Sequence, residues 1–217
     1  MRKKSQSSVA LKQSILDTAE RFFKEHGYAK TTLQMIADEL GIAQGTVTYH
    51  FKNKALMLFD LFNNFFLASY AYVRENLTEG FNYYLYYCIV FISTHREIMK
   101  NERTRALFCN KDNMALMIQE RLSEVEKMYQ FISNDYHKGH TQEDIRAAAL
   151  LDLGGRTQMV QALNQNFEDM TAETYCYHQV FHIGVLARLD EATIERNIRL
   201  AYDFLNDHQM PTIFLLE

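Results

Sequence analysis

The chain has little that interrupts a helix or builds a cysteine site. Its 217 residues include one proline, Pro211, so long stretches can remain helical. Its three cysteines, Cys88, Cys109 and Cys176, lie far apart and form neither a zinc motif nor a redox motif. Buried free thiols in a reducing compartment are their expected state. We therefore expect an all-α, cytoplasmic protein of one or two domains.

Signals for secretion, membrane insertion and catalysis are also missing. No apolar core follows the basic residues Arg2, Lys3 and Lys4, so they do not begin a signal peptide. The longest apolar run, Tyr83 to Ile92, is too short to span a bilayer. The sequence contains no nucleophile elbow, P-loop, paired-carboxylate site or dinucleotide fingerprint. We expect a protein that is not an enzyme, uses no cofactor and does not enter a membrane.

Charge is divided unevenly along the chain. Residues 1–54 contain 9 Lys and Arg against 5 Asp and Glu, a net charge of +4, whereas the rest of the chain carries −8. A basic end on an acidic body directs that end toward phosphates. Arg2, Lys3 and Lys4 precede the first predicted helix, where they either add phosphate or minor-groove contacts or form a solvated terminus.

Residues 31–54 have the pattern of two short helices joined by a tight turn. Thr31 is placed to cap the first helix, and Gln34 stands in the capping-box position three residues on. Apolar side chains then recur at helical spacing, and Gly41 supplies the left-handed conformation that ends a helix. A second helix of about two turns is expected over residues 43–51.

The second helix has an apolar side and a polar side. Val47 and Phe51 are four residues apart and can anchor it to a core. Short polar side chains then remain outward, and Gly45 permits a close approach of the backbone to a partner. This arrangement is typical of a helix-turn-helix, which places its second helix in the major groove of DNA. We expect base-edge contacts from Gln44, Thr46 and Thr48, and phosphate contacts from Thr32, Tyr49, His50, Lys52 and Lys54.

These residues resemble the DNA-binding domain of the TetR family of bacterial transcriptional regulators. Residues 13–28 resemble the family's first helix. The family's helix-turn-helix pattern is matched at Thr31, Thr32, Ile36, Ala37, Gly41, Gly45, Thr46, Tyr49, His50, Phe51, Lys54 and Met57. The chain departs from the pattern at Ala43, Thr48 and Ala55. Ala43 removes a capping oxygen worth about 1 kcal/mol, and Thr48 suggests an operator unlike those of better-known members.

The resemblance implies a domain organisation and a mechanism. We expect a helix-turn-helix domain over residues 1–53 and a helical effector-binding and dimerisation domain over residues 54–217. As a homodimer, the protein would repress by reading a palindromic operator in double-stranded DNA. A small effector would move the helix at 54–77 as a lever and lift repression. The alternatives are a DNA-bound interaction protein without an effector, and a helical enzyme or carrier whose helix-turn-helix is incidental.

Further helices are predicted behind the helix-turn-helix, over residues 54–77, 78–101, 102–110, 112–136, 141–166, 171–189 and 190–207. Their expected N-caps include Thr141, Thr171 and Asp190. The helix at 78–101 is apolar nearly all round and rich in tyrosine, which favours either a ligand cavity or a plain core. A cavity for an apolar or aromatic effector would be lined by Phe66, Tyr84, Tyr87, Phe91, Phe108, Met117 and Met159. Its polar fixing points would come from Arg103, Arg156, Gln158 and Asn164.

Residues 145–163 combine small side chains with the pair Gly154-Gly155. Such a pair permits either a close approach of helices across a two-fold axis or a local kink. By analogy with the family, whose late helices pair between subunits, the interface is expected to include Ala148, Leu151, Gly155, His178 and His182. The spacing of the two histidines also suits a metal, but two ligands rarely make a closed site, and we expect no metal.

Overall fold

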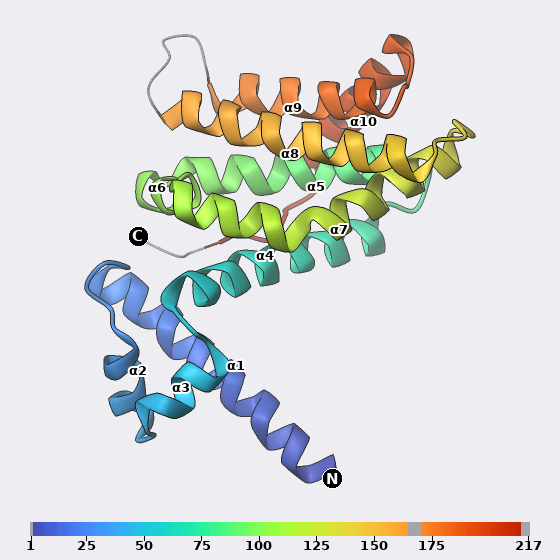
Figure 1. Cartoon of the computed structure of the whole chain (residues 1–217). Helices are drawn as coiled ribbons and strands as arrows, with labels where there is room; N and C mark the ends of the chain where they lie inside the picture. Colours follow the sequence, from blue (N-terminus) through green and yellow to red (C-terminus); the bar gives the residue numbers. More distant parts are fainter. Residues whose placement is uncertain (1, 165–170, 214–217) are drawn as a thin grey trace. The chain divides into compact units, whose positions relative to one another are not determined.

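A computed structural model describes residues 2–164 and 171–213, with all of their side chains except those of 2–7, 111, 112, 114, 115, 117–119 and 164. The described residues form ten helices and no strand, which confirms the all-α prediction (Figure 1). They fall into two compact units, within residues 1–64 and 65–212, and one helix, Lys54–Asn76, contributes to both. The predicted functional boundary at residue 53 stays a prediction, since the boundary between the compact units lies inside this helix.

The first unit contains α1 (Arg2–His26), α2 (Leu33–Leu40), α3 (Gln44–His50) and the first turns of α4 (Lys54–Asn76). Because α1 begins at Arg2, the expectation that Arg2, Lys3 and Lys4 precede the first helix is wrong. The core of the unit is made of fully buried apolar side chains from all four helices and the α3–α4 connection, among them Ile15, Phe23, Ile36, Val47, Phe51, Met57 and Leu58.

The link between α1 and α2 is held by Thr31, which is fully buried. Its hydroxyl donates to the carbonyl oxygens of Phe22 at 3.1 Å and Gly27 at 3.0 Å. The prediction that Thr31 caps α2 is therefore wrong. Thr32 is the N-cap, and its hydroxyl oxygen accepts the amide N–H of Met35 at 3.1 Å. Thr31 bonds to α1 instead of capping α2 because a buried hydroxyl needs a hydrogen-bond partner, and the end of α1 supplies free carbonyl oxygens.

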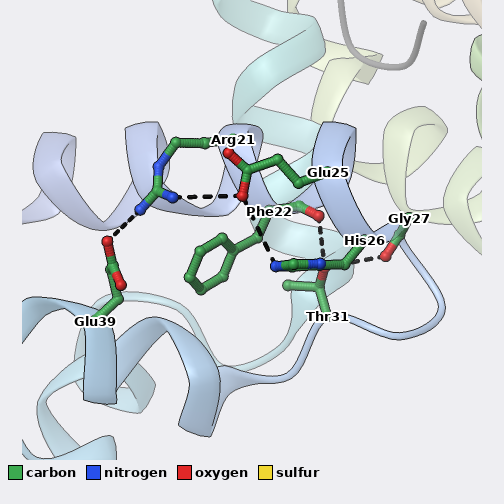
Figure 2. A network of polar contacts seen from close by, with 7 residues as sticks. All are labelled: Arg21, Phe22, Glu25, His26, Gly27, Thr31 and Glu39. Atoms are coloured by element: carbon green, nitrogen blue, oxygen red, sulfur yellow. Dashed lines mark hydrogen bonds and ion pairs between the residues drawn. The ribbon is translucent and has the colours of Figure 1, made fainter.

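A surface network joins the same two helices. Figure 2 shows Arg21 of α1 between Glu25 of its own helix and Glu39 of α2. Gly41 ends α2 with φ +63°, and the next amide, that of Ile42, donates to the carbonyl of Ala37 at 3.0 Å. The predicted glycine stop is thus confirmed, and it sets the angle at which α3 leaves α2.

The second unit is built around α5 (Tyr83–Lys100), most of whose residues are buried. This helix contacts α6 (Glu102–Phe108), α7 (Lys111–Asp135), α9 (Ala172–Leu186) and α10 (Glu191–Asp207). Helix α8 (Gln142–Asn164) lies beside α7 and α9 (Figure 1). The predicted burial of the tyrosine-rich helix is confirmed.

Most helices of the second unit begin where local capping signals predict. Thr141, Thr171 and Asp190 cap α8, α9 and α10 through side-chain oxygens, as predicted. The predicted start of α5 at Thr78 is wrong, because the helix begins at Tyr83 behind the N-cap Asn82. The intervening loop includes a glycine with φ +65°, a conformation that a helix does not contain.

Gly184 of α9 is the glycine that packing requires. A Cβ at this position would lie 2.6 Å from Cγ1 of Ile194 and 2.7 Å from the hydroxyl of Tyr84. The backbones of α9 and its neighbours can therefore approach closely only without a side chain. A Cβ on Gly154 or Gly155, by contrast, would meet no atom within 4 Å, and both glycines are exposed.

By length and composition, α4 qualifies as a helix that could cross a membrane. Core helices of soluble proteins have the same length and composition. In α4, 44% of the apolar 18-residue segment is buried inside the structure. The sequence-based expectation considered only uninterrupted apolar runs. It therefore missed α4, in which polar residues interrupt the apolar ones. That the protein does not enter a membrane stays a prediction.

Candidate nucleic-acid interface and ligand cavity

Helix α3 is anchored on one side by apolar burial. Val47 is fully buried and Phe51 is nearly so, and the amide of Phe51 donates to the carbonyl of Val47 at 2.8 Å. Ala43 occupies the N-cap position and makes no side-chain capping bond. A seven-residue helix without a cap is held mainly by its tertiary anchors.

The other side of α3 presents polar groups to solvent. Gln44, Gly45 and Thr48 are exposed, and Tyr49 is 83% exposed. The hydroxyl of Thr48 donates to the carbonyl of Gln44 at 3.1 Å, so its oxygen lone pairs remain available as acceptors. Among the other residues predicted to contact DNA, Thr46 and His50 are half-buried, and Thr32 and Lys52 are exposed.

Gly45 has no structural reason to be glycine within this chain. It lies inside α3, outside the positive-φ residues, and a Cβ built on it would meet nothing within 4 Å. The missing side chain therefore leaves bare backbone on the exposed side of the helix. Such a surface is suited to close contact with an external partner.

Lys54 has a different role from the one predicted. Its ammonium group donates to the carbonyl oxygens of Tyr28 at 2.6 Å and Ala29 at 3.2 Å, and it lies 4.7 Å from the centre of the Tyr28 ring. Desolvation by burial lowers the pKa of Lys54. We therefore correct its assignment as a phosphate contact: Lys54 ties the first turn of α4 to the α1–α2 loop.

The second unit encloses a cavity of about 70 Å³ beside α5. Its wall is formed by aromatic rings together with polar and aliphatic side chains from α4 to α9: Phe66, Tyr70, Tyr87, Val90, Phe91, Thr94, His95, Phe108, Arg121, Leu153, Arg156, Thr157, Val160 and Tyr175. Four of the predicted lining residues are thus brought together, namely Phe66, Tyr87, Phe91 and Phe108.

The other predicted lining residues lie elsewhere. Tyr84 is fully buried in the core, where its hydroxyl donates to the carbonyl of Val180 at 2.8 Å. Met159 is half-buried and does not line the cavity. The assignments of Tyr84 and Met159 are therefore corrected. The side chain of Met117 lies outside the described residues. Among the predicted polar fixing points, Arg156 lines the cavity, Arg103 and Gln158 do not, and the side chain of Asn164 is outside the described set.

Arg156 is held in the cavity wall by a buried carboxylate. Its Nε donates to Oδ1 of Asp152 at 2.7 Å, and an Nη atom contacts the other carboxylate oxygen. Gln179 of α9 donates to the same Oδ1 at 2.9 Å. The guanidinium also lies 5.1 Å from the ring centre of Phe91. The bidentate geometry fixes the plane of the guanidinium against the aromatic wall.

A second cation and a neutral imidazole also belong to the polar part of the wall. The guanidinium of Arg121 lies 4.1 Å from the centre of the Phe66 ring. His95 stacks on Phe91 with ring centres 3.8 Å apart, and its Nδ1 is 3.0 Å from the Phe91 carbonyl oxygen. Burial, and after it the positive charge of Arg156, lowers the pKa of His95 to about 3. The imidazole is therefore neutral near pH 7.

The predicted dimer residues lie on α8 and α9, and most face outward. Leu151 is 64% exposed, and Gly155, His178 and His182 are exposed as well. Ala148 is an exception, because it is buried within the chain, and its assignment to the interface is corrected. Exposed apolar neighbours not predicted from the sequence are Leu150 and Val185. Over the residues that the structure describes, no group of three or more potential metal ligands is found.

A helix-turn-helix unit joined to a purely helical unit defines the class of all-α helix-turn-helix proteins. Residues 15–61 match the family of bacterial regulatory proteins named tetR. Residues 15–61 therefore form a DNA-binding domain of the TetR type, which confirms the resemblance seen in the sequence.

Curated relatives are similar to part of this chain, and solved structures share its fold. The probable acrEF/envCD operon repressor of Escherichia coli K12 is 34% identical over 76 residues, which are 34% of this chain and 33% of that protein. The chain thus matches only about a third of that relative's length. The structure of RolR without ligand has a TM-score of 0.60 at 12% identity, covering 93% of this chain and 99% of that one. SmeT, a repressor of a multidrug efflux pump in Stenotrophomonas maltophilia, has a TM-score of 0.50 at 22% identity, covering 80% and 88%. Identities this low show a shared fold alone.

Proposed function

We propose that this protein is a cytoplasmic transcriptional repressor that binds a palindromic operator as a homodimer and releases it when a small effector occupies the α5 cavity. The observation that carries the proposal is the exposed polar side of α3, anchored behind by Val47 and Phe51. A short helix with one buried side and one polar side is what a reader of the major groove requires.

Sequence reading is assigned to uncharged side chains of α3. Gln44 carries an amide that can pair with adenine, and Thr48 offers acceptor lone pairs. Thr46, although half-buried, stays with them as a base contact. Lys52, Tyr49, His50 and Thr32 are assigned to phosphates, which position the protein on the duplex without reading sequence.

The dimer is assigned to the outer sides of α8 and α9. Leu151 and Val185 are exposed apolar residues on these helices, and Gly154 and Gly155 leave α8 without side chains where a partner helix could approach. Two copies related by a two-fold axis would place two α3 helices on successive half-sites of a palindrome.

Regulation is assigned to the cavity. SmeT, which shares the fold, has been seen in complex with triclosan, so an aromatic ligand is compatible with this architecture. Phe66 and Tyr70 of α4 line the cavity here, and the same helix begins at Lys54 in the helix-turn-helix unit. A ligand that displaces these two side chains would act on α4 as the lever, and a coupling of about 1–3 kcal/mol would suffice.

The salt dependence of operator binding tests the DNA part of the proposal. In an anisotropy titration with a duplex obtained by binding-site selection, Lys52→Ala should lower the salt slope by about one unit, because one phosphate contact is lost. Lys54→Ala is the matched comparison. It should leave the slope unchanged and lower the stability instead, because it removes the donor to Tyr28 and Ala29. Equal slopes for Lys52→Ala and the unmodified protein would contradict the assignment of Lys52.

The dimer has its own test. Leu151→Glu should shift the full chain toward monomer in analytical ultracentrifugation, because a charge would be buried in the interface. Leu200→Glu on α10 is the control, since Leu200 is also exposed but lies outside the assigned surface. A similar effect of both variants, or of neither, would refute the α8–α9 interface.

A further inference from the structure

His95 brings a hydrogen-bond acceptor into the aromatic wall of the α5 cavity. The ring centres of Phe66, Phe91, Phe108 and Tyr175 lie 3.8 to 5.9 Å from that of the imidazole. Its Nδ1 is 3.0 Å from the carbonyl oxygen of Phe91, and because a carbonyl oxygen can only accept, Nδ1 carries the proton. The buried imidazole is neutral, so Nε2 is an acceptor, and it makes no hydrogen bond to a residue that the structure describes.

Tyr175 supplies a donor in the same wall. Its side chain is fully buried and lines the cavity, and its hydroxyl has no hydrogen-bond partner among the described residues. Burial holds the pKa of Tyr175 well above its ordinary value, so the hydroxyl keeps its proton. The ring centres of Tyr175 and His95 are 5.8 Å apart, which brings both polar groups within reach of one small ligand. Buried groups without partners cost free energy that hydrogen bonds to a ligand would recover.

The two cations of the wall are already engaged within the chain. Arg156 is paired with the buried carboxylate of Asp152. Arg121 is not free either, and the carboxylate of Glu124 is one of the charges that act on it. Recognition of a ligand therefore falls to the uncharged groups of the wall, which favours a neutral molecule.

The size of the cavity limits the occupant to one ring. Aromatic side chains surround the space, and such rings favour another ring in offset or edge-to-face contact. The volume of about 70 Å³ is roughly half that of a cavity known to hold benzene, about 150 Å³. One ring therefore enters only with small displacements of the wall, and little space remains for a substituent. A hydroxyl is a small substituent that both donates and accepts a hydrogen bond.

From these observations we propose that the effector is a neutral, single-ring phenol. Its hydroxyl donates to Nε2 of His95 and accepts from the hydroxyl of Tyr175, while its ring packs against the aromatic wall. An aromatic ketone would satisfy only Tyr175, and an aromatic hydrocarbon would satisfy neither group. This inference rests on the proposed function, in that it names the chemical class of the effector.

Two probes of nearly equal size test the hydroxyl directly. Phenol and toluene differ only in whether the ring carries a hydroxyl or a methyl group. A purely apolar cavity would prefer toluene, because the hydroxyl of phenol loses its hydrogen bonds to water on entry. In calorimetric titration of the full-length protein we instead expect phenol to bind at least about tenfold more tightly than toluene, because its hydroxyl meets two buried groups that lack partners. A smaller ratio would overturn the inference.

Variants identify the two groups. Tyr175→Phe removes only a hydroxyl that has no partner among the described residues, so the protein should remain folded. His95→Phe replaces the imidazole by an apolar ring. Each change should lower the preference for phenol to about threefold or less, because one of two hydrogen bonds is lost. Tyr129→Phe is the matched control and should keep the full preference, since Tyr129 is also a buried tyrosine but is not among the lining residues. Circular dichroism and thermal unfolding establish that each variant is folded.

The outcomes separate this inference from the proposed function. Retention of the full preference in either the Tyr175→Phe or the His95→Phe protein would overturn the phenol, and so would an equal loss in the Tyr129→Phe control. Tighter binding of benzoate than of phenol would overturn the neutral ligand. Absence of phenol binding at millimolar concentration would also overturn the inference. Failure of the proposed function would appear elsewhere, as the absence of sequence-selected DNA binding by the unliganded protein, which the calorimetry does not measure.

Discussion

Replacing Gly45 with alanine separates the stability of the free protein from its ability to approach DNA. Gly45 is the second residue of α3, and a Cβ there would meet no atom within 4 Å. Glycine inside a helix costs about 0.5–1 kcal/mol relative to alanine. We therefore expect Gly45→Ala to stabilise the protein by up to that amount and to raise the melting temperature by about 1–4 °C.

The same methyl group should have the opposite effect on DNA binding. It would stand on the exposed side of α3, where we expect the bare backbone to come close to the groove of the DNA. Adding a methyl to a well-packed contact costs about 1–3 kcal/mol, which corresponds to an increase in the dissociation constant of about 5- to 150-fold.

Two measurements on one variant check this reasoning. Thermal unfolding reports the stability of the free protein, and anisotropy titration with the selected operator at fixed salt concentration reports DNA binding. A dissociation constant within twofold of the original, together with the expected stabilisation, would refute the close approach at Gly45. A loss of stability would instead show that the methyl group is not accommodated within the chain.

The buried polar groups of the second unit allow two further predictions. Because the pKa of His95 drops from 6.5 to about 3 on folding, the unfolded chain binds a proton between these values and the folded chain does not. Stability should therefore fall as the pH is lowered through this range, by up to about 1.4 kcal/mol per pH unit, and His95→Phe should lack this contribution. Urea unfolding at pH 7 and pH 5 measures it, and an equal pH dependence in both proteins would count against the argument. Asp152→Ala should lose about 3–5 kcal/mol because Arg156 stays buried without its carboxylate, whereas Asp152→Asn should lose less. Equal losses in urea unfolding would show that the charge is unimportant.

The helix-turn-helix was predictable because its determinants are local. The glycine stop and the spacing of the two apolar anchors can each be recognised within a few residues of sequence. In the structure, Gly41 ends α2, and Val47 and Phe51 are buried, as expected. Thr31 and Lys54 were assigned wrongly because each bonds to the end of α1 or the loop behind it, at a distance in sequence that no local pattern reveals.

The cavity was predictable only in part: Phe66, Tyr87, Phe91, Phe108 and Arg156 line it as expected. Tyr87 and Phe91 are four residues apart, and the same spacing reaches His95, a signal that could have placed this histidine in the wall. Arg121 and Tyr175 come from α7 and α9, and only the packing of three helices brings them together. Tyr84 was misplaced because periodicity shows that a helix is buried on several sides without showing which side adjoins space.

In helix α8, Arg156 and Gly154 are two residues apart and face different sides of the helix. Arg156 faces the cavity, while Gly154 is exposed and carries no side chain. At that point no side chain of α8 could carry a displacement of the arginine to a second subunit of the proposed dimer. If the proposed dimer forms on this side of α8, the main chain itself would have to shift, and because a helix is a stiff rod, a small displacement of Arg156 would act along the whole contact between the two subunits.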